Sequence, residues 1–265
     1  MKATKKKSRS ETGHVKNLMN FEDLLVRFNA LGPRYTPSRP ELQLGHLQQV
    51  QQEAQMVFDR LTMALTLNDT ATNTRFDLFE LLRPLATRIV NNLIASGVSA
   101  KTLEDARGFQ RKIQGTRLSK KETDAPPAPM ETSAAETAAN GTENGETAAD
   151  KTRSGSRLSY DLKIDHFAKL VSLAQNEPMY QPHEPDLQIG ALQNFLQQLR
   201  TANTNKTYAE AELEAARSER QRVFYHPETG MVPLAMQAKA YVKAALGTTS
   251  EDCKYIQRIK FRMMG

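Results

Sequence analysis

A segment that occurs twice decides the fold: it reads YTPSRPELQLGHLQ at residues 35–48 and YQPHEPDLQIGALQ at residues 180–193. Eight of the fourteen positions are identical without a gap, and the two segments begin 145 residues apart. Internal self-similarity of this kind is the signature of a duplicated structural unit. We therefore expect the chain to contain two copies of one folding unit.

The match between the copies continues on both sides of this segment. The same spacing pairs Phe21 with His166, and a small insertion in the second copy shifts the later pairs. The first copy is predicted to span residues 16–115 and the second residues 158–265. The further pairs are Leu25-Val26 with Leu170-Val171, Arg75 with Arg220, Phe79 with Phe224, Pro84-Leu85-Ala86 with Pro233-Leu234-Ala235, Gly97 with Gly247, and Gln110-Arg111 with Gln257-Arg258.

Both copies have the composition of helices. Ala, Leu, Gln, Glu, Lys and Arg dominate the periodic segments, and alternating β-branched and aromatic runs do not occur. Apolar residues recur at spacings of three and four, as at Leu44, Leu47 and Ala54, which predicts one face of a helix. The sequence thus predicts an all-α fold of two tandem homologous antiparallel bundles, with four to five helices in each.

Local signals predict where the first helices lie. A short helix is expected at residues 19–30, mirrored at residues 164–175. A proline-rich segment follows each of them. It is expected to be extended, because a residue before proline avoids the α conformation. In the first copy, residues 38–41 (SRPE) resemble a capping box that opens the next helix.

The longer helices are predicted to break at polar runs. Residues 68–70 (NDT) and 203–205 (NTN) favour a turn that divides the long helix of each copy in two. Gly97 and Gly247 are predicted C-terminal caps, since glycine accepts a positive φ at little cost. The last helices are expected to begin near Thr102 and Thr249, which can cap a helix with their hydroxyls.

Between the copies lies a segment of low complexity. Residues 119–157 contain no Leu, Ile, Val, Phe, Tyr or Trp and a single Met. Such a sequence cannot bury enough apolar surface to offset an ordering cost of about 1–2 kcal/mol per residue. Residues 116–157 are therefore predicted to be a disordered linker.

Positive charge gathers at the N-terminus. Of the formal net charge of +6, the first ten residues contribute five basic side chains, and the predicted bundles are close to neutral. Residues 1–15 are predicted to be a disordered basic tail. Lys5, Lys6, Lys7 and Arg9 are candidate phosphate contacts, although no aromatic residues are interleaved with them.

Several classes of site have no support in the sequence. Cys253 is the single cysteine, which excludes an internal disulfide and a zinc site built on several thiolates. The five histidines show no i, i+4 pair, and no glycine-rich phosphate loop or G-x-S-x-G occurs. No stretch approaches the roughly 18–20 apolar residues of a membrane span. We expect no enzyme activity, no cofactor, no metal, no membrane partner and a cytoplasmic location.

The residues that both copies retain are the remaining candidates for a site. They are Tyr35 and Tyr180, Arg75 and Arg220, and Arg111 and Arg258. One interpretation makes them a repeated binding groove. The other, which we favour, makes them structural: the tyrosines pack the proline-rich segments against the bundles, and the arginines pair with acids on neighbouring helices.

Several stretches together resemble a known family. They are PLATRIV at residues 84–90, ASG at 95–97, RKIQG at 111–115, IDHFAKLV at 164–171 and VFY at 223–225. In this combination they are similar to an uncharacterised bacterial family of internally duplicated helical proteins. The resemblance covers both copies, roughly residues 21–115 and 158–261. It implies the duplicated helical architecture, and because that family has no assigned chemistry it supplies no catalytic residue.

The expected function is that of a non-enzymatic protein-interaction or scaffold protein. Two similar bundles on a flexible tether can bind a multivalent partner far more tightly than one bundle can. The alternative is a nucleic-acid-associated accessory protein that uses its basic N-terminal and C-terminal segments.

Overall fold

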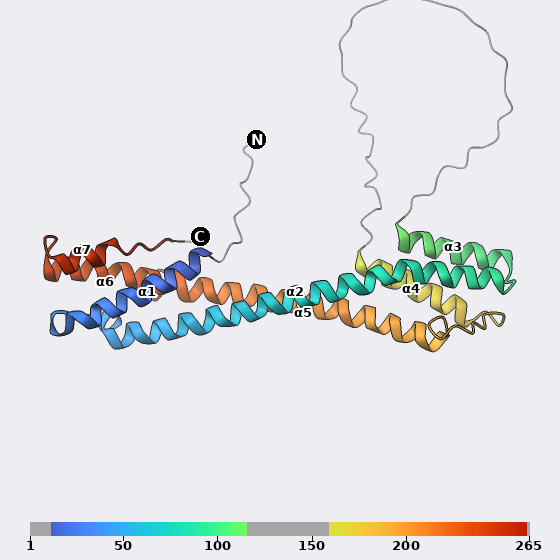
Figure 1. Ribbon diagram of the computed structural model, residues 1–265, viewed down its shortest axis with the longest axis horizontal. Coiled ribbons are helices and arrows are strands. Elements are labelled where there is room, and N and C mark those ends of the chain that lie inside the picture. The colour runs from blue at the N-terminus through green and yellow to red at the C-terminus, as the bar shows by residue number, and fades with distance from the viewer. Residues whose placement is uncertain (1–11, 116–158, 264–265) are drawn as a thin grey trace, which may run out of the picture. The chain divides into compact units, whose positions relative to one another are not determined.

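The computed structural model describes residues 12–115 and 159–263. These residues form seven α-helices and two short 3-10 helices, and they contain no strand (Figure 1). The all-α prediction is confirmed for this part of the chain. The predicted linker at 116–157 and the basic side chains Lys5, Lys6, Lys7 and Arg9 lie outside the described residues.

The chain divides into two compact units. Unit 1 contains residues up to Arg75 and from Thr204 onward, and unit 2 contains residues 76–203. The helices of unit 1 are α1 (Thr12–Leu31), η1 (Gly32–Arg34), η2 (Pro40–Leu42), the first part of α2 (Leu44–Ala95), the last part of α5 (Ile189–Tyr225), α6 (Met231–Leu246) and α7 (Glu251–Arg258). Unit 2 contains the last part of α2, α3 (Ala100–Gln114), α4 (Tyr160–Gln175) and the first part of α5.

These units do not coincide with the two copies of the sequence. Unit 1 joins the N-terminal part of copy one to the C-terminal part of copy two, and unit 2 joins the remaining parts. In unit 1, α1 packs on α6, with Phe21, Leu24 and Phe28 fully or almost fully buried in the same core as Met231 and Leu234. In unit 2, α3 and α4 share a core that contains Ile113 and Phe167.

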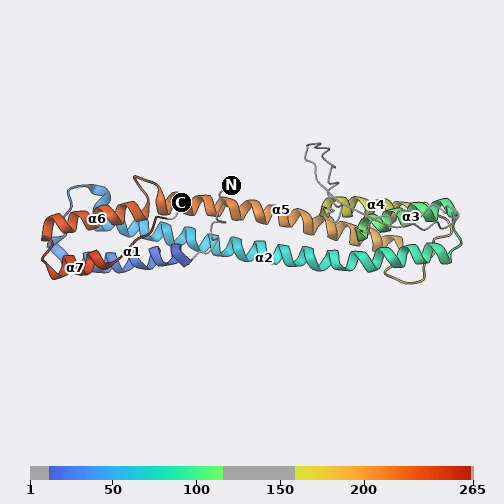
Figure 2. The same ribbon diagram turned by 90° about the horizontal axis from the view of Figure 1, so that it is seen from above.

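The predicted breaks at residues 68–70 and 203–205 are wrong. Both α2 and α5 run through them without interruption. Inside unit 1 the two helices lie side by side in opposite directions (Figures 1 and 2), and the ion pairs Arg60–Glu212 (2.7 Å) and Glu53–Arg222 (3.1 Å) fix this order. A small core of Leu61, Ala64, Leu213 and Ala216 lies between them. Packing along this seam holds polar residues in the helix that would favour a turn in isolation.

The continuity of α2 and α5 changes the number of helices. Copy one holds three α-helices in its described residues instead of four to five, and copy two holds four. In copy two the chain leaves the helix at Tyr225 and restarts at Met231, because the inserted segment at residues 226–230 contains Pro227 and Gly230. In copy one no such insertion exists, and α2 continues through Pro84 to Ala95.

Several helix ends differ from the prediction. The first helix begins at Thr12 instead of residue 19, α3 is capped by Ser99 instead of Thr102, and α7 begins at Glu251. The Ser99 hydroxyl accepts a hydrogen bond from the Thr102 backbone N–H at 3.1 Å. Residues 40–42 form a 3-10 helix, so the predicted capping box does not open α2. The glycine caps are confirmed, since φ is 70° at Gly97 and 74° at Gly247.

Burial corrects the pairing of the first helices. Phe21 and Phe167 are both fully buried, whereas His166 is partly exposed. In its burial Phe21 matches Phe167, one residue beyond the ungapped match, and not His166. Around Tyr35 and Tyr180 the ungapped match describes the geometry well, because each tyrosine hydroxyl donates to the backbone carbonyl seven residues later. The duplication of the whole unit stays a prediction from the sequence.

Candidate functional site

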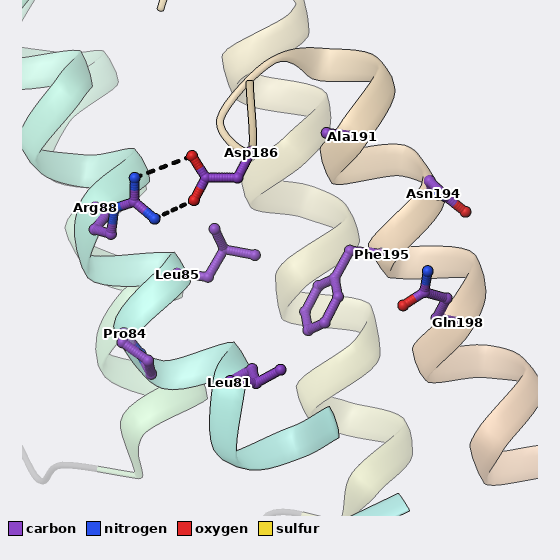
Figure 3. Close-up of a pocket in the computed structure, with 9 residues that line it drawn as sticks. All are labelled: Leu81, Pro84, Leu85, Arg88, Asp186, Ala191, Asn194, Phe195 and Gln198. Carbon is purple, nitrogen blue, oxygen red and sulfur yellow. Dashed lines mark hydrogen bonds and ion pairs between the residues drawn. The ribbon is translucent and has the colours of Figure 1, made fainter. Parts of the chain in front are cut away.

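An open groove of about 400 Å³ lies in unit 2 between the last part of α2 and the start of α5 (Figure 3). One wall belongs to α2 and the other to α5, and the segment that precedes α5 contributes Asp186 at one end. Its lining is largely apolar, with an ion pair at one end and two amides along the α5 wall. The lining residues are Leu81, Pro84, Leu85, Arg88, Asp186, Ala191, Asn194, Phe195 and Gln198.

The α2 wall follows from helical spacing. Leu81, Leu85 and Arg88 lie three or four residues apart, so their side chains occupy one face of the helix. The adjacent face of the helix carries the fully buried Leu82, Ala86 and Ile89, which fix the orientation of the helix. Leu81 is 58% exposed, which makes it the most accessible large apolar side chain of this wall.

The α5 wall is centred on Phe195. Its ring lies perpendicular to that of Phe167, with 5.7 Å between the ring centroids. Phe167 is itself fully buried on α4, so the core holds the Phe195 ring in place while one side of it faces the groove (Figure 3). The amides of Asn194 and Gln198 are exposed on the same helix and offer hydrogen bonds at the mouth of the groove.

An ion pair closes one end of the groove. The Arg88 guanidinium donates two hydrogen bonds to the Asp186 carboxylate, one of them 3.0 Å long (Figure 3). These hydrogen bonds lower the pKa of the Asp186 carboxyl and raise the pKa of Arg88. Both side chains are about half exposed, so the pair adds geometry rather than much stability.

Tyr180 positions the segment that carries Asp186. Its hydroxyl donates to the Leu187 carbonyl at 2.9 Å, and both residues are buried. Burial raises the pKa of Tyr180 to about 12, so its hydroxyl stays protonated and keeps donating across the usual pH range. The tyrosine thus acts on the groove through the backbone and does not line it.

The corresponding position in unit 1 carries a different polar link. Asp186 pairs with Glu41 in the sequence repeat, and Arg88 pairs with Gln237. In the structure Arg39 joins these two residues, since it donates to Glu41 at 3.0 Å and to Gln237 at 2.6 Å. The two units therefore do not present the same surface at this place.

The other predicted residues are not brought together into one site. Tyr35, Arg75, Arg220 and Arg258 belong to unit 1, whereas Tyr180 and Arg111 belong to unit 2. Tyr35 stacks on Phe28 and donates to the Leu42 carbonyl at 2.7 Å. Arg220 is buried, Arg75 is half-buried, and Arg111 and Arg258 are exposed. The packing role predicted for the two tyrosines agrees with these contacts.

Sequence reasoning did not identify the groove. Arg88 and Asp186 are 98 residues apart in the chain, and neither belongs to a motif. Leu81 and Phe195 look like ordinary members of helical apolar faces. The only signal was that Leu81 and Leu85 fall beside, instead of on, the face occupied by Leu82 and Ala86.

No three His, Cys, Asp or Glu side chains gather as metal ligands within residues 12–115 and 159–263. No helix in the same residues is both long and apolar enough to cross a membrane. Cys253 is buried on α7.

Comparison of the chain with protein-family models, with curated proteins and with solved structures found no match.

Proposed function

We propose that this chain is a non-enzymatic interaction protein and that the groove of unit 2 binds an amphipathic helix of a partner protein. The carrying observation is an apolar groove between two helices with an ion pair at one end and amides along the α5 wall. Recognition of a helix by a groove uses apolar side chains one turn apart on the bound helix. The proposal also includes the scaffold role that the duplication predicts.

The shape of the groove supports a helical occupant. A volume of about 400 Å³ accommodates two or three large apolar side chains. Leu81, Leu85 and Phe195 provide apolar contact, and a third helix laid along the groove would cover the exposed part of Leu81. The walls are already held by the core of unit 2, so little conformational entropy is lost on binding.

The polar groups favour a particular partner. At one end Arg88 offers a guanidinium and Asp186 a carboxylate. On the α5 wall Asn194 and Gln198 offer amides. A partner helix with apolar side chains at i and i+4 and polar residues beside them satisfies both regions. An entirely apolar helix would cover the amides of Asn194 and Gln198 without offering them hydrogen bonds.

Substitution of Leu81 by aspartate tests the proposal. Leu81 is 58% exposed, so Leu81→Asp should leave the fold intact while it places a charge in the groove. The matched control is Leu162→Asp, at a leucine of α4 that is 49% exposed. Proteins captured by the full chain from its native cell should include one that is lost with Leu81→Asp and kept with Leu162→Asp.

A direct binding measurement must follow the capture. The chain contains no tryptophan, so Leu81→Trp introduces a single fluorescent reporter at the groove. A synthetic peptide that covers the amphipathic helix of the captured protein should change this emission with a dissociation constant in the micromolar range, about −8 kcal/mol. If Leu81→Asp and Leu162→Asp capture the same proteins, the groove is not the binding site.

A further inference from the structure

The surplus of positive charge in the described residues belongs entirely to unit 1. Within residues 76–115 and 159–203, unit 2 has nine basic and nine acidic side chains. Within residues 12–75 and 204–263, unit 1 has sixteen basic and thirteen acidic side chains. A polyanion is therefore attracted to unit 1. The place where the cations of unit 1 gather decides how the polyanion could bind.

The C-terminal segment of unit 1 is fastened to α1 by side chains. Asn17 forms two hydrogen bonds with the Arg262 backbone, accepting from its N–H at 3.1 Å and donating to its carbonyl at 2.8 Å. Asn20 donates to the Lys260 carbonyl at 2.7 Å, and the Lys239 ammonium donates to the Ile259 carbonyl. Phe261 packs edge-on against the buried Phe21.

Because the segment is attached in this way, its basic side chains form an exposed row. Ile259 is buried and Phe261 is half-buried, while Arg258, Lys260 and Arg262 are exposed. Side chains of α1 and α6 hold the backbone of Ile259, Lys260 and Arg262, so the points from which the cationic side chains project are set before any ligand arrives. Less entropy is then lost on binding than for cations on a free chain.

A groove runs between this row and α1. It has a volume of about 400 Å³, and its lining includes Lys16 and Arg27 from α1 together with Arg258 and Lys260. Tyr255 stands in the same groove and is 49% exposed. The guanidinium groups of Arg27 and Arg258 lie 5.7 Å and 5.3 Å from the centre of its ring, so cation–π attraction gathers both arginines at one place.

One carboxylate lines this groove. Asp23 lies 3.2 Å from the Arg27 guanidinium, one turn away on the same helix. It holds Arg27 over the groove and offsets a single positive charge. The four cations and one carboxylate therefore leave the groove with a net positive charge.

We propose that this basic groove, formed by Lys16, Arg27, Tyr255, Arg258 and Lys260 with Arg262 beside it, binds the phosphodiester backbone of a nucleic acid without reading its sequence. Guanidinium groups bind phosphate oxygens in pairs, and several separated cations match a ligand with a repeated charge.

A salt-dependent binding assay tests this groove. The probe is a fluorescent single-stranded oligonucleotide of mixed sequence, and the protein is the full chain with Arg258→Gln and Lys260→Gln. Each lost phosphate contact should reduce the slope of log affinity against log salt by about 0.7. Two lost contacts then correspond to roughly twentyfold weaker binding at 0.1 M salt.

The sequence repeat provides a matched control. Arg111 is the counterpart of Arg258, and the Arg111→Gln, Lys112→Gln chain loses the same charge on α3 of unit 2. It should bind the oligonucleotide nearly as the unaltered chain does. Equal weakening by both variants would show that binding follows net charge alone and would overturn the proposal. If the double variant unfolds at a lower temperature than the original chain, Lys16→Gln on α1 serves as a second groove variant.

Two further measurements distinguish the groove from the N-terminal tail as the binding site, and a nucleic acid from an anionic membrane as the ligand. Deletion of residues 1–10 should weaken binding, yet the groove variant should weaken it further in the deleted chain. If the deletion alone abolishes binding, the tail and not the groove is the site. Vesicles with anionic phospholipid should compete poorly with the oligonucleotide, and binding to vesicles without binding to the oligonucleotide would also overturn the proposal. None of these outcomes depends on the groove of unit 2.

Discussion

Tyr35 and Tyr180 show how single residues fix the proline-rich segments. Each is at most 7% exposed, and each hydroxyl donates to the carbonyl of a buried leucine seven residues later. A proline-rich segment cannot satisfy its backbone through a regular helix, so a side chain supplies the missing donor. The identity of both tyrosines in the repeat made them visible in the sequence, and their role as packing residues was predicted there.

Replacement of Tyr180 by phenylalanine should destabilise the protein by about 1–2 kcal/mol, because the buried Leu187 carbonyl loses its donor. Burial raises the folded-state pKa of Tyr180 to about 12, above the value of about 10 expected in an unfolded chain. The stabilisation is thus complete below about pH 10 and is lost as the pH rises toward 12. Urea unfolding at a series of pH values should show this loss in the original chain.

The phenylalanine variant supplies the comparison. With Tyr180→Phe, the part of the alkaline destabilisation that comes from this residue should disappear, so the two curves should converge as the pH approaches 12. Tyr208→Phe is the control, since Tyr208 is 71% exposed and should change neither the stability nor its pH dependence. Unchanged stability of Tyr180→Phe at neutral pH would show that the hydrogen bond contributes nothing.

At the scale of elements, local signals predicted the two glycine caps but not the continuity of the long helices. The glycine caps at Gly97 and Gly247 were recognised because positive φ is a property of one residue. The break expected at residues 68–70 did not occur, since α2 and α5 pack along a seam with Leu61 and Leu213 buried in it. That seam joins residues about 150 positions apart, so no local pattern could reveal it.

Substitutions at Asp69 distinguish a continuous helix from a turn. Asp69 is exposed in the middle of α2. Asp69→Pro should cost about 3 kcal/mol or more, because proline removes a helical hydrogen bond and clashes with the preceding turn. Asp69→Ala should be neutral or slightly stabilising, since alanine has the higher helix propensity. Urea denaturation followed by circular dichroism measures both, and a well-tolerated proline would favour the predicted turn.

At the scale of the whole molecule, the repeat and the compact units divide the chain differently. The sequence predicts two copies in tandem, and each was expected to form its own bundle. Each unit instead takes helices from both copies. Duplicated sequences carry equivalent apolar faces, so the sequence alone cannot decide whether a face packs within its own copy or on the other one. The two grooves depend on this choice, since each uses residues from both copies.

Cutting the chain between the copies tests the interleaved arrangement. Residues 1–115 contain α1, whose buried Phe21 and Phe28 pack in a core with α6, and α6 is absent from this fragment. Residues 159–265 contain α4, which packs on the missing α3. Neither fragment should therefore form a stable monomer, whereas an equimolar mixture should regain the helical content of the whole chain as a one-to-one complex.

Sedimentation and thermal unfolding of the fragments measure this directly. Because the covalent connection is gone, the midpoint of unfolding of the complex should rise with protein concentration, whereas that of the intact chain should not. A fragment that pairs with a second copy of itself would keep the interleaved packing, with one copy of the repeat standing in for the other. A fragment of residues 1–115 that unfolds cooperatively as a monomer, at the same temperature as the intact chain, would contradict the arrangement, because α1 would then have found its packing partner within its own copy.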